Sequence, residues 1–149
     1  MLITMEQKDK ELLLKDLSAR LSYGVICNTP KGDGYLNSIN QTIFDVELGI
    51  NIININSVHR DTFKLENCKP YLRPMSSMTE EEYNDMFNQL YLAQEEFFRN
   101  CSNADTIGKF IGNDMVKYDW LTKKMFDFRY LIPKGLALEA PEGMYKKGE

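Results

Sequence analysis

With 149 residues, a formal charge of −4 and an isoelectric point near 5.1, the chain has the size of one domain and an acidic balance. Hydrophobic residues at 43% and aromatic residues at 11% are ordinary for a globular protein, so the composition argues against wholesale disorder. Because contacts to phosphate require a basic surface, the charge disfavours nucleic-acid binding as the main function.

The N-terminal region and the cysteines indicate in which cellular compartment the protein is expected. No stretch approaches the ~20 apolar residues that a transmembrane helix needs. Charged residues between Glu6 and Lys10 interrupt the region where a signal peptide would have its apolar core. Cys27, Cys68 and Cys101 form an odd, widely spaced set, which favours free, buried thiols over disulfides or a zinc site. We therefore expect a cytoplasmic protein without membrane contact.

The first predicted element is an amphipathic helix over residues 7–22. Leucines recur there at three- and four-residue spacing, with charged residues between them, and they are Leu13, Leu14, Leu17 and Leu21. Gly24 is suited to end this helix, because glycine adopts the left-handed conformation common after a helix C-terminus.

Short β segments follow, and residues of about 23–72 are predicted to form a small, curved antiparallel sheet. The sequence leaves open whether this sheet closes partly into a barrel. Residues 30–34 predict a hairpin turn, since they lack the spacing of a phosphate-binding loop. Between 43 and 56 apolar and polar residues alternate, but the alternation slips by one at Ile53 and Ile55. We expect a bulge, turn or strand break between about 48 and 53.

A junction between sheet and helix is predicted within residues 69–82. Pro70 and Pro74 hold the chain extended, because each fixes its own φ and restricts the preceding residue. Thr79 and Glu82 have the spacing of a capping box, in which each side chain binds the backbone amide of the other residue. The longest helix should therefore begin directly after Thr79.

The C-terminal half is predicted to be helical, with helices at about 80–99, 104–111 and 114–126. Gly112 and Asn113 are expected to form the turn between the last two helices. The tail, 131–145, is apolar enough to pack on the rest of the chain. The helix at 80–99 has one wide apolar stripe, made of Tyr83, Met86, Phe87, Leu90, Ala93 and Phe97 and broadened by Leu92 and Phe98.

Taken together, these elements predict a single α+β domain over residues 1–149. It has an N-terminal helix, a small curved antiparallel sheet and a helical C-terminal half.

Catalytic, metal-binding and cofactor-binding motifs are not evident in the sequence. His59 is the single histidine, and no nucleophile motif surrounds it. One histidine and three dispersed cysteines do not supply convergent zinc ligands. The acidic residues at the start of the helix 80–99 are explained by helix capping and the helix dipole. We therefore expect a non-enzymatic protein without a cofactor.

An aromatic-rich segment predicts a protein interaction surface. Exposed aromatic and arginine side chains dominate binding hot spots, and the candidates here are Tyr118, Trp120, Arg129 and Tyr130. The competing interpretation places Trp120 in an ordinary helix–helix core, which is the commoner fate of a tryptophan in such a segment.

The alternative function is nucleic-acid binding by a segment that resembles a helix-turn-helix, residues 104–126. In this interpretation the contacts to nucleic acid come from Lys117, Lys123 and Lys124. Four aspartates in and beside the segment offset most of its positive charge, and they are Asp105, Asp114, Asp119 and Asp127.

Two sequence blocks, KPYLRPMSSMTEEE at 69–82 and a second at 119–145 containing LIPKGLALEAPEGMY, resemble a group of uncharacterised small proteins. These proteins are encoded by phages and integrated elements of gut anaerobic bacteria, and residues 17–25 are similar to theirs as well. The resemblance implies an intracellular accessory protein of a mobile element and supplies no catalytic residues. We therefore expect a protein that binds and modulates a host or phage protein.

Overall fold

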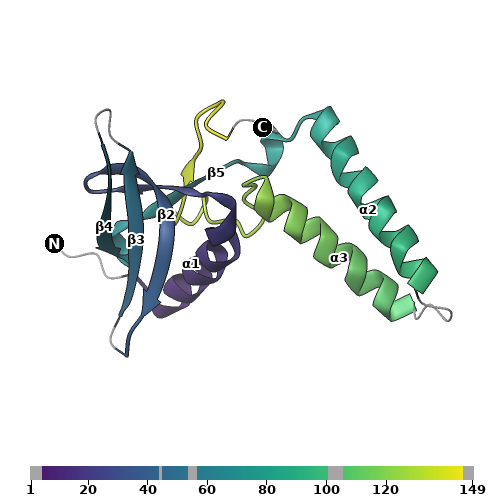
Figure 1. The fold of residues 1–149 in the computed structure, drawn as a ribbon, viewed down its shortest axis with the longest axis horizontal. Coiled ribbons are helices and arrows are strands. Elements are labelled where there is room, and N and C mark those ends of the chain that lie inside the picture. Colours follow the sequence, from purple (N-terminus) through teal and green to yellow (C-terminus); the bar gives the residue numbers. More distant parts are fainter. Residues whose placement is uncertain (1–4, 44, 54–56, 101–105, 146–149) are drawn as a thin grey trace.

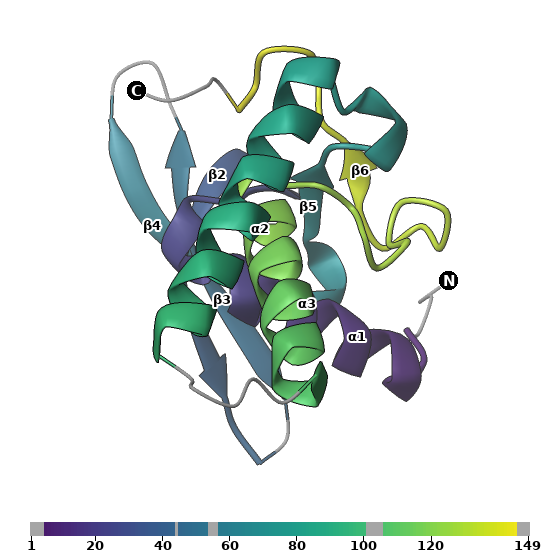
Figure 2. The ribbon, with the colours of Figure 1, turned by 90° about the vertical axis from the view of Figure 1, so that its right-hand side faces the viewer.

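A computed structural model describes residues 5–43, 45–53, 57–100 and 106–145, with the backbone alone at 58, 97–100 and 106–113. Figure 1 shows a β-sheet with the N-terminal helix against it and, projecting from this body, a pair of long helices. The pair consists of α2, Glu80–Asn100, and α3, Thr106–Lys123, and we call it the helical arm. Figure 2 looks onto the arm, where the two helices lie side by side in front of the body.

The sheet has six strands in the order β4-β3-β2-β1-β5-β6. All neighbours pair antiparallel except β5 and β6, which are parallel, so the sheet is mixed. It is also open, with β4 and β6 at its edges. The strands within the predicted range of about 23–72 do pair antiparallel, and the C-terminal tail adds a further, parallel strand that the sequence did not predict. The strands are β1, Ile26–Thr29; β2, Gly32–Gln41; β3, Val46–Ile53; β4, Val58–Lys64; β5, Lys69–Leu72; and β6, Leu138–Glu139.

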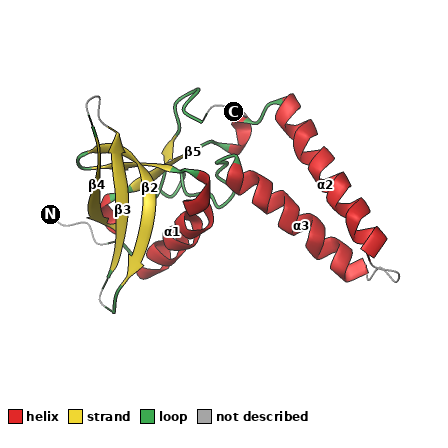
Figure 3. Cartoon of the chain, in the orientation of Figure 1, coloured by secondary structure: helices red, strands yellow, loops and turns green. Residues whose placement is uncertain are grey.

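The main apolar core lies between the sheet and α1, Gln7–Arg20. The helix contributes Leu13 and Leu17, and β3 contributes Leu48 and Ile50, all of them fully buried. Figure 3, in which helices are red and strands yellow, shows this helix lying against one face of the sheet. The predicted α+β architecture with a leading helix is confirmed, since an amphipathic helix must bury its leucines against a neighbouring layer.

The turn predicted at residues 30–34 is the tight connection between β1 and β2. Thr29 pairs with Gly32 across it, which leaves two residues in the loop. The Thr29 hydroxyl donates to the Gly32 carbonyl at 2.6 Å and accepts from the Lys31 amide at 3.2 Å. Side-chain hydrogen bonds of this kind replace ladder bonds that a turn cannot form.

The slip in alternation at Ile53 has a different outcome from the one predicted. β3 continues without a break from Val46 to Ile53, and the register shift lies in its partner β2, between Leu36 and Ser38. Ile53 is simply an outward-facing residue at the end of the strand, half exposed, while Ile55 lies outside the described residues. An irregularity of the expected kind is present, but it is a register shift in β2 and not in β3.

Arg73 and the capping box fix the junction between the sheet and the arm. The Thr79 amide donates to Glu82 and the Glu82 amide donates to the Thr79 hydroxyl, both at 3.1 Å, as the sequence predicts. Glu82 also accepts two hydrogen bonds from the Arg73 guanidinium, at 2.6 and 2.7 Å. The same guanidinium lies 4.1 Å from the centre of the Phe126 ring. One arginine thus ties the end of the sheet to the base of both arm helices.

α3 runs as one continuous helix through Gly112 and Asn113, so the prediction of two helices with a turn between them is wrong. A glycine inside a helix costs only about 1 kcal/mol relative to alanine, so one glycine is not enough to end a helix. The helix ends at Lys123, three residues before the predicted end at 126. Two residues later, Met125 has a φ of 65°, which a helix does not allow. The start predicted at 104 lies outside the described residues.

The continuity of α3 can be tested with Gly112→Ala. Because alanine removes the backbone entropy cost of glycine within a helix, we expect the free energy of unfolding to rise by about 1 kcal/mol. Urea denaturation followed by circular dichroism measures this. If Gly112 were instead a turn residue with positive φ, alanine would lower the stability by a similar amount.

The tail packs on the body through its last described residue. Tyr145 donates from its hydroxyl to the Tyr71 carbonyl at 2.8 Å and accepts from the Ile26 amide at 2.9 Å. Burial raises the pKa of the Tyr145 hydroxyl. β6 and Tyr145 therefore close the edge of β5, which would otherwise expose unpaired backbone groups.

Candidate interaction surface on the helical arm

The predicted apolar stripe of α2 is too wide to be covered by α3 alone. Met86 and Leu90 pack into a small second core with Trp120 and Leu121 of α3. Two aromatic members of the predicted stripe remain at the surface, Tyr83 at 49% and Phe87 at 51% exposure, and Tyr91, which was not predicted as a member, is 61% exposed. A single neighbouring helix covers a sector of roughly 100° around the axis of α2, and the apolar stripe is wider than this sector. The side chain of Phe97 lies outside the described residues.

Tyr83, Phe87 and Tyr91 form what we call the aromatic stripe. Residues four apart in a helix lie on one face, so the three side chains follow one another over about 12 Å. The Tyr83 and Phe87 rings touch, with centroids 4.8 Å apart and planes tilted by 58°. The three side chains therefore lie along one face of the helix, and together they expose more apolar area than an isolated surface residue.

Carboxylates border the aromatic stripe at both ends. Glu80 lies three residues before Tyr83, and Glu95 lies four residues after Tyr91, both on the side of the helix that carries the stripe. The Tyr91 hydroxyl is hydrogen-bonded to Glu95, and this carboxylate raises the pKa of the tyrosine. The stripe is thus an apolar row between two negative charges.

Two further acidic residues in the first half of α2 make contacts within the chain. Glu82 is buried against Arg73, and Asp85 accepts a hydrogen bond of 2.9 Å from the Trp120 indole. The sequence predicts the first of these roles through the capping box. It gives no sign of the second, because Asp85 and Trp120 are 35 positions apart.

The four residues predicted as an interaction surface differ in their exposure and contacts. Trp120 is only 7% exposed and belongs to the core of the arm, which is the competing interpretation of its role. Arg129 is part-buried and donates to Asp16 of α1 at 2.7 Å. Tyr118 lies against Phe128, with ring centroids 5.2 Å apart. Tyr130 is the most exposed of them, at 67%.

The lysines proposed for nucleic-acid contact lie beside aromatic or acidic side chains of the arm. Lys117 lies over the Tyr118 ring at 5.9 Å. Lys123 and Lys124 line a shallow hollow of about 370 Å³ together with Asp85 and Asp119, whose carboxylates offset their charge. Since α3 is continuous, the described part of this segment also has no helix-turn-helix geometry.

The remaining candidates for chemistry are separated. His59 lies exposed on the edge strand β4, whereas Cys27 and Cys68 are free and buried in the core. Burial raises the pKa of the Cys68 thiol to about 12 and also raises that of Cys27, so both thiols are neutral near pH 7. Cys101 lies outside the described residues. Within the described ranges, no three His, Cys, Asp or Glu side chains gather as a metal site would require.

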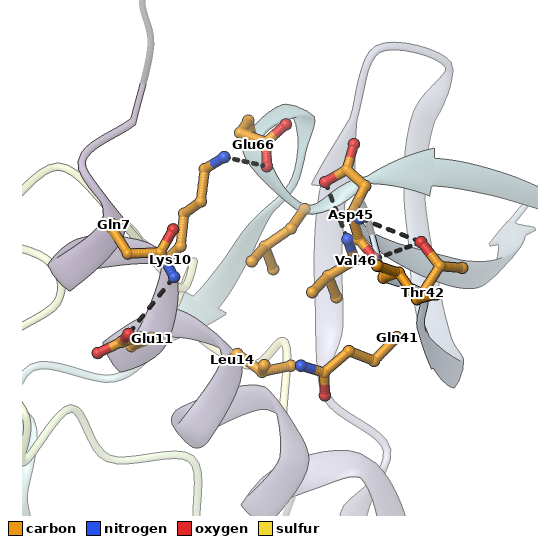
Figure 4. Close-up of a pocket in the computed structure, with 11 residues that line it drawn as sticks. Gln7, Lys10, Glu11, Leu14, Gln41, Thr42, Asp45, Val46 and Glu66 are labelled. Atoms are coloured by element: carbon orange, nitrogen blue, oxygen red, sulfur yellow. Dashed lines mark hydrogen bonds and ion pairs between the residues drawn. The ribbon is translucent and has the colours of Figure 1, made fainter.

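The hollow between α1 and the loop before β3 has about 300 Å³ and is shown in Figure 4. Glu66 and Lys10 form an ion pair of 3.4 Å across one side of it, and Asp45 accepts from the Val46 amide on the other. Its charged groups are thus directed at partners within the chain. Ile43, at 95% exposure, lies at its open rim.

Comparison of the chain with protein-family models, curated proteins and solved structures found no match. Among the described residues, none of the helices combines the length and the apolar character needed to cross a bilayer.

The sequence places Tyr83 and Phe87 in the predicted apolar stripe of residues 80–99, but Tyr91 was not included and no binding role was predicted for this helix. A usable signal was present, however. The apolar residues of α2 extend around the helix from Met86 to Tyr91, a sector wider than one packed helix covers. Such a width indicates a second contact surface on the same helix.

Proposed function

We propose that this chain is a non-enzymatic protein that binds another protein through the aromatic stripe of its helical arm. The observation that carries the proposal is the exposure of Tyr83, Phe87 and Tyr91 in one row on α2. Tyrosine and other aromatic residues dominate the energetics of protein interfaces, because they bury a large area at little cost in conformational entropy.

The placement of the aromatic stripe also supports binding. The arm projects from the body, so α2 is accessible along its length (Figure 1). Arg73 holds the base of the helical arm, because it contacts both Glu82 and Phe126. A surface on a supported helix is presented in one orientation, which limits the entropy lost on association.

The resemblance to small proteins of phages and integrated elements supports a more specific proposal. In that setting the chain would be an accessory protein in the bacterial cytoplasm that binds a host or phage protein and modulates it. A small acidic protein without catalytic groups acts by occupying a surface that its partner needs.

The proposal is tested by affinity capture from a lysate of the cells that encode the chain, at physiological salt. We expect the triple variant Tyr83→Ser, Phe87→Ser, Tyr91→Ser to recover its partner at least about tenfold less well than the wild type, because it lacks the aromatic anchors. Quantitative mass spectrometry of the recovered proteins measures the difference.

Two control variants locate the surface. Tyr35→Ser removes a tyrosine of similar exposure from the sheet and should leave capture unchanged. The double variant Tyr118→Ser, Tyr130→Ser tests the surface predicted from the sequence. If that double variant abolishes capture and the triple variant does not, or if no protein is retained by the wild type, the proposal is wrong.

A further inference from the structure

We infer that the open face of the sheet binds a phosphate group, and that this phosphate belongs to a nucleotide, either free or within a single-stranded nucleic acid. The site lies around Gly49 of β3 and is formed by Ser38 of β2 and by Arg60 and Thr62 of β4. It lies on the body, apart from the aromatic stripe of the arm, and it does not depend on the proposed function.

These residues lie on the face of the sheet that α1 does not cover (Figure 1). Successive side chains of a strand point to opposite faces, and Ile50, next to Gly49, is buried in the core with α1. Ser38 and Thr62 lie directly opposite Gly49 on its two sides, so both belong to the other face. Arg60 precedes Thr62 by two residues and shares this face, and both side chains are exposed.

Gly49 provides the space in which these groups meet. It is not among the residues with a positive φ, so its backbone conformation does not require glycine. A Cβ atom at this position would overlap the Ser38 hydroxyl and would lie 2.9 Å from both Nε and Nη2 of Arg60. A glycine inside a strand weakens the strand and often marks a position that a ligand approaches closely.

The β-bulge in β2 brings Ser38 to this point. Leu36 pairs with Ile50 and Ser38 pairs with Gly49, so β2 contains one extra residue between the two pairs. Without this extra residue, Asn37 would lie opposite Gly49. Bulges are common beside functional sites, where they redirect a side chain.

The charge of Arg60 has no carboxylate to offset it within the described residues. Its guanidinium donates to the neutral Ser38 hydroxyl at 2.6 Å, which leaves further N–H groups for a ligand. Lys64 of the same strand, by contrast, lies opposite Glu47 and pairs with Asp45 at 3.8 Å. Basic and acidic side chains are equal in number over residues 1–79, so the acidic balance of the chain does not arise in the sheet.

The donors around Gly49 fit the oxygens of a phosphate. The Ser38 hydroxyl accepts from Arg60 and still has its own hydrogen to donate, as does the Thr62 hydroxyl. The two hydroxyls approach from the strands on either side of Gly49, and the guanidinium adds charge-assisted hydrogen bonds. Donors from several directions suit a tetrahedral phosphate better than a planar carboxylate, which has only two oxygens.

Tyr35 and Asn51 supply contacts for the base of a nucleotide. Asn51 follows Gly49 by two residues on the same face, and it pairs with Arg60 on one side and with Tyr35 on the other. The Cα atoms of Tyr35 and Arg60 are therefore about 10 Å apart, which is two strand spacings. The Tyr35 side chain is 47% exposed. Bases stack on exposed aromatic rings, and asparagine can form hydrogen bonds to a base edge.

The site is tested by titrating the isotope-labelled full chain and following its amide chemical shifts. The probes are ribose 5-phosphate, adenosine 5′-monophosphate and a short single-stranded RNA. We expect saturable shifts at positions 38, 49, 60 and 62 with each probe. Adenosine monophosphate should bind at least about tenfold more tightly than ribose 5-phosphate, because its base stacks on Tyr35. Tighter binding of the RNA than of the mononucleotide would identify nucleic acid as the source of the phosphate, and equal affinity would identify a free nucleotide.

Four variants locate the contacts. Arg60→Gln removes the charge, and Gly49→Ala displaces the ends of two flexible side chains, which leaves the fold intact. Each should weaken the binding of ribose 5-phosphate at least about tenfold. Lys64→Gln removes an equal charge from the same strand and should change this affinity less than about twofold. Tyr35→Ser should weaken the binding of adenosine monophosphate about tenfold and leave that of ribose 5-phosphate unchanged.

Three results would overturn the inference. The first is the absence of saturable shifts when the wild type is titrated with ribose 5-phosphate. The second is an equal loss of affinity in Lys64→Gln and Arg60→Gln, because the attraction would then be a general effect of positive charge. The third is equal affinity for ribose 5-phosphate and adenosine monophosphate, which would exclude a contact with the base.

Discussion

Replacing Arg20 with leucine is expected to lower the free energy of unfolding by about 3–5 kcal/mol, the largest effect we predict for a single substitution. Arg20 is fully buried, and its guanidinium donates to Asp16 at 2.9 Å and to the carbonyls of Thr122 and Phe126 at 3.1 and 2.6 Å. Removing it takes one of two cationic partners from the buried Asp16 carboxylate and one hydrogen bond from each of the two carbonyls, and water cannot replace these bonds inside the core.

The arginine also joins separate parts of the fold. Asp16 belongs to α1 and accepts from Arg129 as well, whereas Thr122 and Phe126 lie at the end of the arm. Loss of Arg20 should therefore loosen the attachment of the arm to the body. We expect a single unfolding transition in the wild type and an earlier loss of near-ultraviolet signal from Trp120 in the variant.

Urea denaturation monitored by circular dichroism measures the stability change, with Arg60→Leu as a matched control. Arg60 is exposed on β4 and bonds only to the Ser38 hydroxyl in the described contacts, so its loss should cost under about 1 kcal/mol. If Arg20→Leu lowered the free energy of unfolding as little as Arg60→Leu, hydrophobic repacking would compensate for the lost hydrogen bonds and ion pair. The stabilising role that we assign to Arg20 would then be wrong.

Replacing Glu82 with glutamine is expected to destabilise the protein at neutral pH and to have little effect in acid. The hydrogen-bonded Arg73 guanidinium lowers the pKa of Glu82 from an ordinary value near 4.5 to about 2. This difference corresponds to about 3 kcal/mol of stability. A carboxyl with a lowered pKa stabilises the fold above pH 4.5 and loses that contribution as the pH falls toward 2.

The measurement compares the wild type and Glu82→Gln by urea denaturation at pH 7, 4.5 and 3. The difference in unfolding free energy should be about 2–3 kcal/mol at pH 7 and should shrink steadily at the two lower values. Glu80→Gln, in the same helical turn but exposed, should cost under about 0.5 kcal/mol at each pH. A difference that stays constant with pH would show that packing at Glu82, and not its charge, stabilises the junction.

Features that depend only on neighbouring residues can be predicted from the amino-acid sequence alone. Thr79 and Glu82 define the start of α2 because a capping box needs only three residues of spacing. Pro30 and the glycines after it fix the turn between β1 and β2, and the leucines of residues 7–22 predict α1. Short-range signals of this kind require no knowledge of the fold.

Contacts between residues that are far apart in the sequence become known only from the tertiary structure. Arg20 reaches Phe126, 106 positions away, and Tyr145 reaches Ile26, 119 positions away, so no local pattern indicates either contact. The parallel pairing of β6 with β5 and the burial of Trp120 against Asp85 are of the same kind. For α2, the sequence correctly predicts an apolar helix, but only the position of α3 decides which of its aromatic residues remain exposed. A helix pattern specifies which side chains are apolar, and the number of neighbours that pack on the helix specifies how many of them are covered.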